Sequence, residues 1–365
     1  MPIQSCLAGV RVLDFSRLLP GPYCTWLLAE LGAEVIKIES PLAGDGLRHA
    51  PPGQGFEGMF DTLNHNKRML GLNYRHPLGR AVVLRLARRA DVLVESFRPG
   101  ALARWGLDAA ALQAANPGLI YCALSGYGQS GPYRDRAGHD LNYLAAAGLL
   151  GFGRPAGEAP AMPNVPMADL AGGLLAAVRI MGALLERGRT GQGALLDVAL
   201  VDGPLTWLAA LGALQRSEAG PARPPLAGGL PCYQIYRTAD EQAVTLAALE
   251  PVFWGDFCHA AGRPDLIPLQ RDTATAGELA ALFRTRPLAD WLALAEAGDF
   301  CLEPVRSPAA AAAQPAIQLR QAELGLAAPQ VAPGLGADTR AVLAELDLSE
   351  AEWRELEMHH VVRGG

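Results

Sequence analysis

Two side chains near the middle of the chain could carry out acid–base chemistry. His139 lies in the segment 138–143 (GHDLNY), and Asp169 lies in the segment 167–173 (MADLAGG). An imidazole and a carboxylate, each in a short polar island between apolar runs, are typical of a buried site for general acid–base catalysis. The glycines around both would let a bulky ligand approach the backbone. Asp169 also directly precedes a helix-like run, and on its own an aspartate in that place is more typical of a helix N-cap.

Composition and charge narrow the class of protein. At 365 residues the chain is longer than one ordinary core, so we expect two domains. The formal net charge of −6 and the lack of a basic run argue against nucleic acid as a partner. The six cysteines are dispersed without Cys-x-x-Cys pairs, which favours reduced thiols and a cytoplasmic location. We expect no secretory signal and no membrane partner, because apolar stretches are interrupted before they could span a bilayer.

Strand-like and helix-like segments alternate in the first half of the chain, which predicts βαβ units and a parallel sheet with ligand contacts at the carboxyl ends of its strands. The expected strands are 10–15, 33–39, 91–97, 119–125 and 194–200, and the expected helices are 23–31, 77–89, 101–116, 170–185 and 204–216. The first turn, 16–22, lacks the Gly-x-Gly-x-x-Gly pattern, so an NAD site is not predicted. The Pro20-Gly21-Pro22 sequence also fits a simple helix start. Residues 41–64 read as a long surface excursion.

The second half of the chain predicts a smaller α+β domain and a return to the first. Its expected strands are 233–237 and 243–246, and its expected helices are 252–262, 276–284 and 288–296, followed at the end of the chain by 339–346 and 349–357. We therefore expect a large domain over 1–216, a Pro/Gly-rich linker over 217–229, a small domain over 230–324, and a linker with a C-terminal return over 325–365.

The segment 138–143 resembles the signature of α-methylacyl-CoA racemases, which belong to the family III CoA-transferase (CaiB/BaiF) superfamily. Segments 19–24, 90–100 and 125–132 also match that superfamily. The resemblance implies an α/β fold with a Rossmann-like parallel-sheet large domain and a smaller α+β domain. It further implies an interlocked homodimer, in which each chain threads through a hole in the other and active sites form between the large lobe of one chain and the small lobe of its partner.

The activity implied by the resemblance is interconversion of (2R)- and (2S)-2-methylacyl-CoA thioesters through an enolate. His139 and Asp169 would be the opposed bases, Asp140 matches the family residue beside the histidine, and Glu250 matches a small-lobe carboxylate that orients it. We expect backbone N–H groups near Asp169, at a helix N-terminus, to hold the enolate oxygen. No metal is expected, and no cofactor beyond the CoA moiety of the substrate.

Coenzyme A carries a 3′-phosphate and a diphosphate, so an acidic protein needs local cations to bind it. Arg68, Arg75, Arg98 and Arg104 are the candidate cations. The family arginine after the second strand is replaced by Ser40, and we expect Lys37 or Arg75 to substitute for it or binding to be weaker. The residues that match CoA-binding positions of the family are Leu19, Pro20, Leu72, Asn73, Tyr74, Arg75, Ser96, Phe97, Arg98, Arg104, Gly138 and Tyr143.

Two other functions stay open at this point. Transferases of the superfamily use the aspartate at position 169 as a nucleophile that forms an acyl anhydride, and they move CoA between carboxylic acids. They generally lack the histidine and carry a glycine-rich loop in the small lobe, where this chain has only the pair Gly228-Gly229. The third function is acyl-CoA binding without catalysis. The sequence does not identify the acyl group, since fatty acyl, steroid and arylpropionyl chains all require only an apolar channel.

Overall fold

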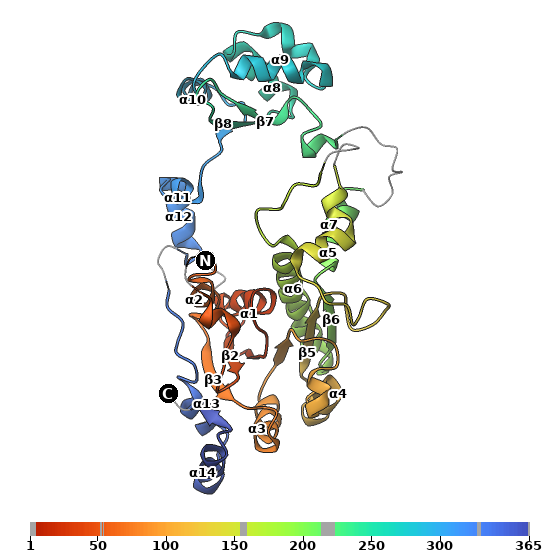
Figure 1. Cartoon of the computed structure of the whole chain (residues 1–365), viewed down its shortest axis with the longest axis vertical. Helices are drawn as coiled ribbons and strands as arrows, with labels where there is room; N and C mark the ends of the chain where they lie inside the picture. Colours follow the sequence, from red (N-terminus) through yellow and green to blue (C-terminus); the bar gives the residue numbers. More distant parts are fainter. Residues whose placement is uncertain are drawn as a thin grey trace. The chain divides into compact units, whose positions relative to one another are not determined.

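The computed structural model describes residues 5–51, 53, 55–153, 159–212, 223–326 and 330–363. The chain forms two compact units (Figure 1). The larger unit comprises Met1–Leu149, Met162–Leu214 and Pro329–Gly365, and the smaller unit comprises Leu150–Ala161 and Gln215–Ala328.

The larger unit is built on a seven-stranded sheet with the order β10-β3-β2-β1-β4-β5-β6. All neighbouring strands are parallel except β10, which pairs antiparallel with β3. This confirms the prediction of an α/β fold with a largely parallel sheet. The strands are β1 (Arg11–Asp14), β2 (Glu34–Glu39), β3 (Arg68–Leu72), β4 (Val92–Glu95), β5 (Ile120–Ser125), β6 (Leu195–Ala199) and β10 (Val362–Arg363).

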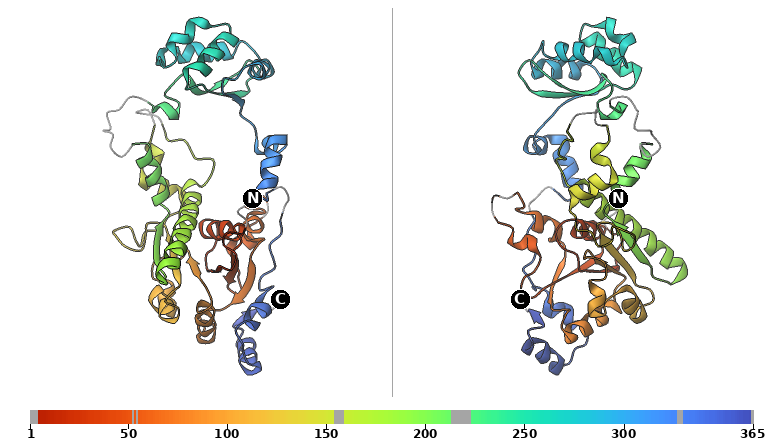
Figure 2. Two further views of the ribbon diagram at one scale, coloured as in Figure 1. Left: turned by 180° about the vertical axis from the view of Figure 1, so that it is seen from behind. Right: turned by 45° about the vertical axis from the view of Figure 1, so that its right-hand side comes forward.

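Helices cover both faces of this sheet, which is why its central strands β4 and β5 are buried along their whole length and largely apolar. One face packs against α3, α4, α13 and α14, and the other packs against α1 and α6. Residues 330–363 return to the larger unit, where α14 lies beside α3 (Figure 2). The helices are α1 (Pro20–Glu30), α2 (Met59–Asn64), α3 (Pro77–Ala87), α4 (Ala109–Ala115), α5 (Asp140–Ala147), α6 (Met167–Thr190), α7 (Asp202–Ala210), α13 (Thr339–Ala344) and α14 (Glu350–Met358).

The long helix α6 is apolar enough, by length and composition, to cross a membrane. It is instead a core helix of the larger unit, because it packs against α1, α5, α7 and β5. Small residues make this close packing possible. A Cβ on Gly172 would lie 2.5 Å from Leu200, and a Cβ on Gly173 would lie 2.5 Å from the Pro20 carbonyl oxygen. These two glycines serve helix packing and not, as the sequence suggested, ligand approach.

The smaller unit has a three-stranded antiparallel sheet with the order β7-β8-β9. Helices pack on one face of it around a core of aromatic side chains, including Trp254, Phe257, Phe283 and Trp291. The elements are β7 (Tyr233–Arg237), β8 (Ala243–Ala247), α8 (Pro251–Ala260), α9 (Ala276–Phe283), α10 (Leu288–Ala297), β9 (Leu302–Pro304), α11 (Pro308–Ala312) and α12 (Pro315–Glu323). The expected small α+β domain is thus present. Part of the predicted linker, residues 217–222, lies outside the described residues.

A network of fully buried charges lies at the carboxyl end of β1. Lys67 Nζ contacts Asp14 Oδ2 at 3.0 Å and donates to Thr25 Oγ1 and the Pro22 carbonyl oxygen. Burial alone would raise the pKa of Asp14, but nearby Lys67 and Lys37 and the hydrogen bonds from Ser16 and Thr25 lower it to about 2. A second pair, Lys37 and Asp45, is also fully buried, with 3.1 Å between Nζ and Oδ2. Each charge is therefore paired and hydrogen-bonded, as burial requires.

The sequence contains only two lysines, Lys37 and Lys67, and both belong to this network. We therefore expect an amine-reactive ester to leave both lysines unmodified in the native protein and to modify both after unfolding in guanidinium chloride. Peptide mass spectrometry would locate the labels, with denatured protein as the matched control. Modification of either lysine at native conditions, at a rate like that of the unfolded chain, would contradict the buried network.

Candidate active site

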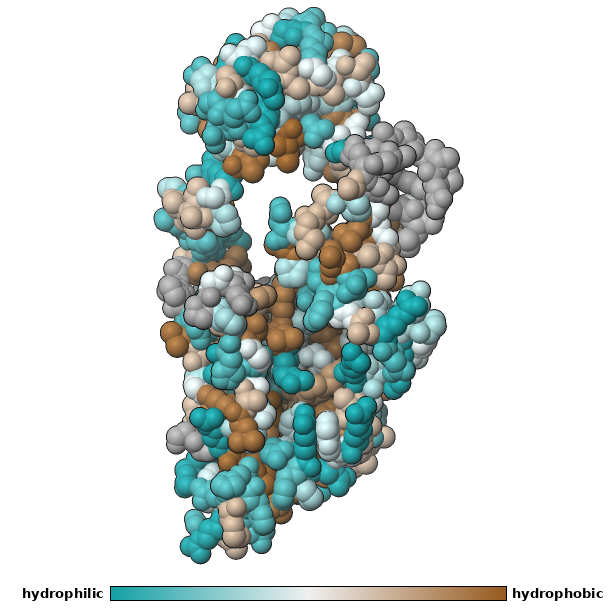
Figure 3. All heavy atoms as spheres, in the orientation of Figure 1, coloured by the Kyte–Doolittle hydropathy of each residue, from teal (hydrophilic) through white to brown (hydrophobic). Residues whose placement is uncertain are grey.

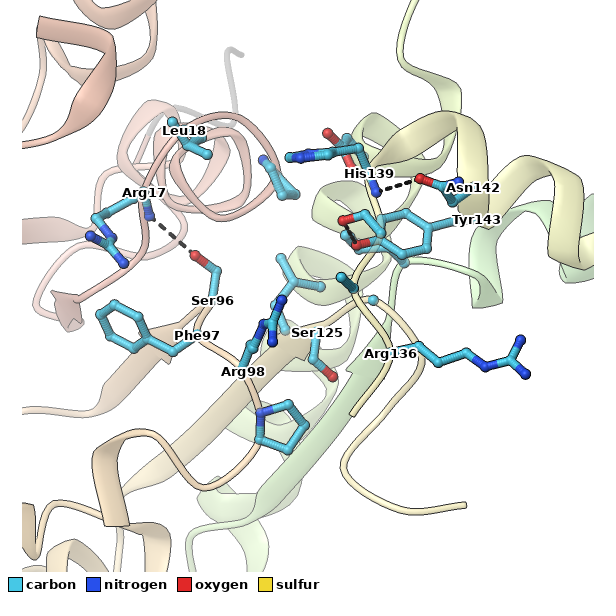
Figure 4. A pocket seen from close by; sticks show the side chains of 18 of the residues that line it. Arg17, Leu18, Ser96, Phe97, Arg98, Ser125, Arg136, His139, Asn142 and Tyr143 are labelled. Carbon is cyan, nitrogen blue, oxygen red and sulfur yellow. Dashed lines mark hydrogen bonds between the residues drawn. The ribbon is translucent and has the colours of Figure 1, made fainter. Parts of the chain in front are cut away.

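A pocket of about 460 Å³ opens at the carboxyl ends of β1, β4 and β5 in the larger unit. This is where a doubly wound sheet is expected to bind ligands. Figure 4 shows His139 and Tyr143 on one side of the pocket, with Arg17, Ser96 and Phe97 on the other and Arg98 reaching between them. The lining residues are Arg17, Leu18, Pro20, Ser96, Phe97, Arg98, Pro99, Leu124, Ser125, Gly126, Arg134, Arg136, Ala137, Gly138, His139, Asn142, Tyr143, Asp169 and Leu200.

His139 is the N-cap residue of α5, a helix that the sequence analysis did not predict. The Asn142 side chain fixes the turn, because its Oδ1 accepts a hydrogen bond of 3.0 Å from the His139 backbone N–H. Tyr143 fixes the preceding peptide, because its hydroxyl donates to the Gly138 carbonyl oxygen. The imidazole itself is exposed and lines the pocket. His139 is therefore presented on a rigid backbone with its ring free to meet a ligand.

Gly138 is needed by the protein itself. A Cβ at this position would lie 2.7 Å from the Tyr143 ring, and a Cβ at Gly126 would lie 2.5 Å from the same ring. The ring thus sits between two glycines, beside the backbone of His139. The glycine flanking the histidine accordingly makes room for Tyr143, and it also lines the pocket.

Asp169 lies in the first turn of α6, as its third residue. The helix begins three residues earlier than expected and Pro166 is its N-cap, so the N-cap interpretation of Asp169 is wrong. Burial of the side chain, followed by repulsion from the Asp140 carboxylate, raises the pKa of Asp169 to about 7. A carboxyl group in this condition can either lose or supply a proton near neutral pH.

Asp140 does not line the pocket, but it joins the two candidate bases. It follows His139 in α5, and its Oδ1 accepts hydrogen bonds from the backbone N–H groups of Ala168 and Asp169, at 2.6 and 3.0 Å. These are the N–H groups that we expected to hold an enolate oxygen. Because Asp140 occupies them, that expectation is wrong in this structure. Asp140 instead caps α6 from the neighbouring helix and places Asp169 beside the pocket.

The residues expected to bind CoA divide into two groups. Pro20, Ser96, Phe97, Arg98, Gly138 and Tyr143 line the pocket, whereas Leu19, Leu72, Asn73, Tyr74, Arg75 and Arg104 do not.

Leu72 and Tyr74 belong to the buried core. Leu72 also pairs with Val362 in the sheet. Arg75 and Arg104 are exposed, and the Arg75 guanidinium lies 4.9 Å from the centre of the Trp105 ring. Both guanidinium groups therefore lie at the surface outside the pocket.

Two cations considered from the sequence have other partners. Arg68 forms ion pairs with Glu34 and Glu345, and Lys37 is completely buried in the network under β1. Lys37 therefore does not substitute for the family arginine whose position is occupied by Ser40 in this chain.

Arg17, Arg134 and Arg136 line the pocket and were missed by the sequence analysis. Arg17 lies over the Phe97 ring at 4.9 Å and its backbone N–H donates to Ser96 Oγ. Arg134 pairs with Asp135, and Arg136 lies over the Tyr133 ring. The only sequence signal for them was a local excess of arginine in loops that follow strands. The pocket is nevertheless strongly cationic, which suits a polyanionic ligand.

A buried carboxylate supports the loop after β4. Glu95 accepts a hydrogen bond of 2.7 Å from the Phe97 backbone N–H, and its burial raises its pKa to about 7. This hydrogen bond thus holds the backbone of the loop 96–98 in place.

Glu250 lies in the smaller unit, as the exposed N-cap residue of α8. Among the described residues, no group of three or more His, Cys, Asp or Glu side chains is arranged to hold a metal ion.

Comparison with known proteins places the chain in a family. The model of CoA-transferase family III matches residues 7–354. Over 308 residues the chain is 37% identical to α-methylacyl-CoA racemase of Homo sapiens, covering 82% of this chain and 77% of the human protein. Over 319 residues it is 37% identical to succinyl-CoA:glutarate CoA-transferase of Mus musculus, covering 82% of this chain and 72% of the mouse protein.

A solved structure agrees with this placement. The crystal structure of a CAIB/BAIF family protein from Brucella suis superposes with a TM-score of 0.81 at 30% identity, covering 94% of this chain and 100% of that chain. The family model, the two relatives and the shared fold lead to the same conclusion: the chain belongs to CoA-transferase family III and is an enzyme that acts on acyl-CoA thioesters.

Proposed function

We propose that the protein is an α-methylacyl-CoA racemase, which interconverts (2R)- and (2S)-2-methylacyl-CoA thioesters. The observation that carries this proposal is the presence of His139 and Asp169 on one pocket, with the pKa of Asp169 raised to about 7. The α-proton of a thioester is a very weak acid, so a racemase needs two well-placed proton carriers and a stabilised enolate. One residue removes the proton from one face, and the other returns a proton to the opposite face.

The coenzyme would be bound by the residues at the pocket rim and by the exposed arginines beside it. Arg17 and Arg98 would meet its phosphates or pantetheine amides, and Arg75 and Arg104 would add positive charge near Trp105. In this proposal Asp140 positions Asp169 through the helix cap, and the partner's Glu250 completes the site by orienting His139. No metal is used, and no cofactor beyond the CoA moiety of the substrate.

The second candidate is transfer of CoA between carboxylic acids. It is favoured by the 37% identity with the mouse succinyl-CoA:glutarate CoA-transferase, which equals the identity with the human racemase. In that reaction the Asp169 carboxylate attacks the thioester carbonyl carbon, the carbon–sulfur bond breaks, and an acyl-aspartyl anhydride and CoA thiolate form. His139 favours the racemase, because transfer through an anhydride needs no proton carrier on the opposite face.

Isotope exchange tests the two-base mechanism. In D₂O the native enzyme should introduce deuterium at the α-carbon of both enantiomers while it interconverts them, as followed by NMR. His139→Ala should lower racemisation by about 10²- to 10⁴-fold, yet leave exchange in the enantiomer whose proton Asp169 removes. Asp169→Asn should show the mirror preference.

Two results would contradict the two-base mechanism. Equal loss of exchange in both enantiomers by both variants, with circular dichroism unchanged, would show that the two residues act on one face. If hydroxylamine trapped an acyl group on Asp169 and CoA passed to a free acid at a catalytic rate, the transferase would be the correct assignment.

The raised pKa of Asp169 also predicts a dependence of stability on pH. The pKa is about 7 in the folded protein against 3.8 for an unperturbed aspartate. Between these values the unfolded chain loses the proton first, so the native protein loses stability as pH rises from about 4 to about 7. Asp169→Asn removes this ionisation. We expect the variant to be more stable than the native protein at pH 8, by at most about 4 kcal/mol, and to lose this advantage near pH 4.

Thermal unfolding at both pH values measures this difference. Asp290→Asn, at an exposed position of the smaller unit, is the matched control. An equal effect of Asp169→Asn at the two pH values would mean that the carboxyl group is ionised with an ordinary pKa.

We further propose that the protein is an interlocked homodimer of the family type. Apolar side chains are exposed on several helices of the larger unit: Leu174, Val178 and Leu185 of α6, which are 51%, 51% and 73% exposed, and Leu141 and Trp207 of α5 and α7. Figure 3 shows apolar residues gathered around α5 and α7. Surfaces of this kind in a soluble enzyme mark protein interfaces.

Light scattering should give twice the chain mass of 38.5 kDa. Leu174→Asp with Val178→Asp should weaken or abolish the dimer, because two charges would be buried in the interface. Ala309→Asp, at an exposed position of the smaller unit, is the control. A native monomer that keeps full activity would rule out the dimer.

A further inference from the structure

Leu18 has an unusual backbone conformation at the rim of the pocket. Its φ is 65°, in the left-handed region that residues other than glycine rarely adopt. The side chain is 48% exposed and lines the pocket together with Arg17. A leucine in this conformation persists only where the surrounding structure holds it.

The Lys37–Asp45 ion pair provides that support. Asp45 accepts hydrogen bonds from the Leu18 backbone N–H, at 3.3 and 3.2 Å from its two oxygens. Lys37 Nζ contacts Asp45 at 3.1 Å and donates to the Ser16 carbonyl oxygen at 2.9 Å. The pair thus fixes the backbone on both sides of Arg17. Neither Lys37 nor Asp45 reaches the pocket, since both side chains are completely buried.

The fixed loop then organises the next part of the pocket. The Arg17 backbone N–H donates to Ser96 Oγ, and the Arg17 guanidinium lies over the Phe97 ring. Ser96 and Phe97 follow β4 and line the pocket as well. A change in the backbone at Leu18 would therefore move Arg17 and remove a contact with the loop after β4.

We propose that Lys37 and Asp45 are positioning residues for coenzyme A binding, which act by holding Leu18 in its left-handed conformation and so placing Arg17. The proposal rests on the assignment of this pocket to the coenzyme. It holds equally for a racemase and for a transferase, because it concerns the shared CoA moiety. Lysine suits the place because a compact ammonium can donate to two oxygens in a dry space where a planar guanidinium would need more room.

Two substitutions at Leu18 test the backbone conformation without disturbing the buried charges. Leu18→Gly permits the left-handed conformation at no steric cost, whereas Leu18→Pro forbids it and removes the N–H that Asp45 accepts. Both variants lose the leucine side chain that lines the pocket, so their difference reports the backbone conformation. We expect Leu18→Pro to bind coenzyme A roughly tenfold more weakly than Leu18→Gly by titration calorimetry. In turnover, the proline variant should raise KM with little change in kcat.

A second set of variants tests the ion pair. Asp45→Asn keeps the shape but removes the charge, and we expect roughly tenfold weaker coenzyme A binding. Adding Leu18→Gly should restore most of that loss, because glycine no longer needs to be held. Should Asp45→Asn be unstable, Lys37→Met with Asp45→Asn leaves no unpaired buried charge and should show the same loss and rescue. Asp265→Asn, which removes an ion pair with Arg263 in the smaller unit, is the matched control and should bind normally.

The outcomes separate this proposal from the proposed reaction. Native coenzyme A affinity in a folded Leu18→Pro variant would overturn the proposal, and so would an Asp45 defect that Leu18→Gly does not relieve. If coenzyme A bound as expected but no α-proton exchange occurred, the positioning role would stand and the racemase assignment would fail.

Discussion

The conformation of the loop that borders the pocket depends on buried charged side chains that do not line it. The side chains of Asp14, Lys37, Asp45 and Lys67 are fully buried around the carboxyl end of β1, and each meets an opposite charge and at least one further hydrogen-bonding group. Taking such ions out of water is costly, and the cost is offset only when geometry and hydrogen bonding are complete. The backbone between β1 and α1 supplies two of these hydrogen-bonding groups, the Ser16 carbonyl and the Leu18 N–H, and the first turn of α1 supplies a third, the Pro22 carbonyl. The loop is consequently held in one conformation before a ligand arrives, which lowers the entropy lost on binding.

A second constraint joins the two candidate bases. Asp140 directly follows His139 in the chain, and its side chain accepts hydrogen bonds from backbone N–H groups in the first turn of α6. The α5 and α6 helices also pack against each other. The relative placement of imidazole and carboxylate is thus set by rigid elements and a cap, and not by flexible side chains. The same Asp140 charge contributes to the raised pKa of Asp169. Asp140 therefore helps to position this base and, after burial itself, adds to its raised pKa without lining the pocket.

The sequence predicted the elements with strong apolar patterns and missed those that depend on tertiary contacts. The central strand β5 has every residue buried and was predicted within one residue of its bounds. In contrast, β10 is two residues long and exists only because the chain end pairs with β3. The candidate bases were predicted from residue type and resemblance, but the contacts that hold them in place were not predicted. Nothing in a linear sequence indicates that Asp140 caps a helix 28 positions later, or that the glycines of α6 contact Leu200 and Pro20. Isolated loop arginines such as Arg17 give no periodic signal at all.

The environment of Asp169 bears on the reaction in two ways. Partial burial next to Asp140 favours the neutral acid, which matches the proton-transfer role, because a base works best when its pKa lies near the working pH. The same desolvation would make the ionised carboxylate a stronger nucleophile, so burial alone does not separate racemase from transferase. The imidazole does. Inversion at the α-carbon requires a proton carrier on each face, whereas anhydride formation at the carbonyl carbon requires none. A histidine presented at the N-cap of α5, with its backbone fixed by Asn142 and its ring lining the pocket, therefore supports the proposed inversion.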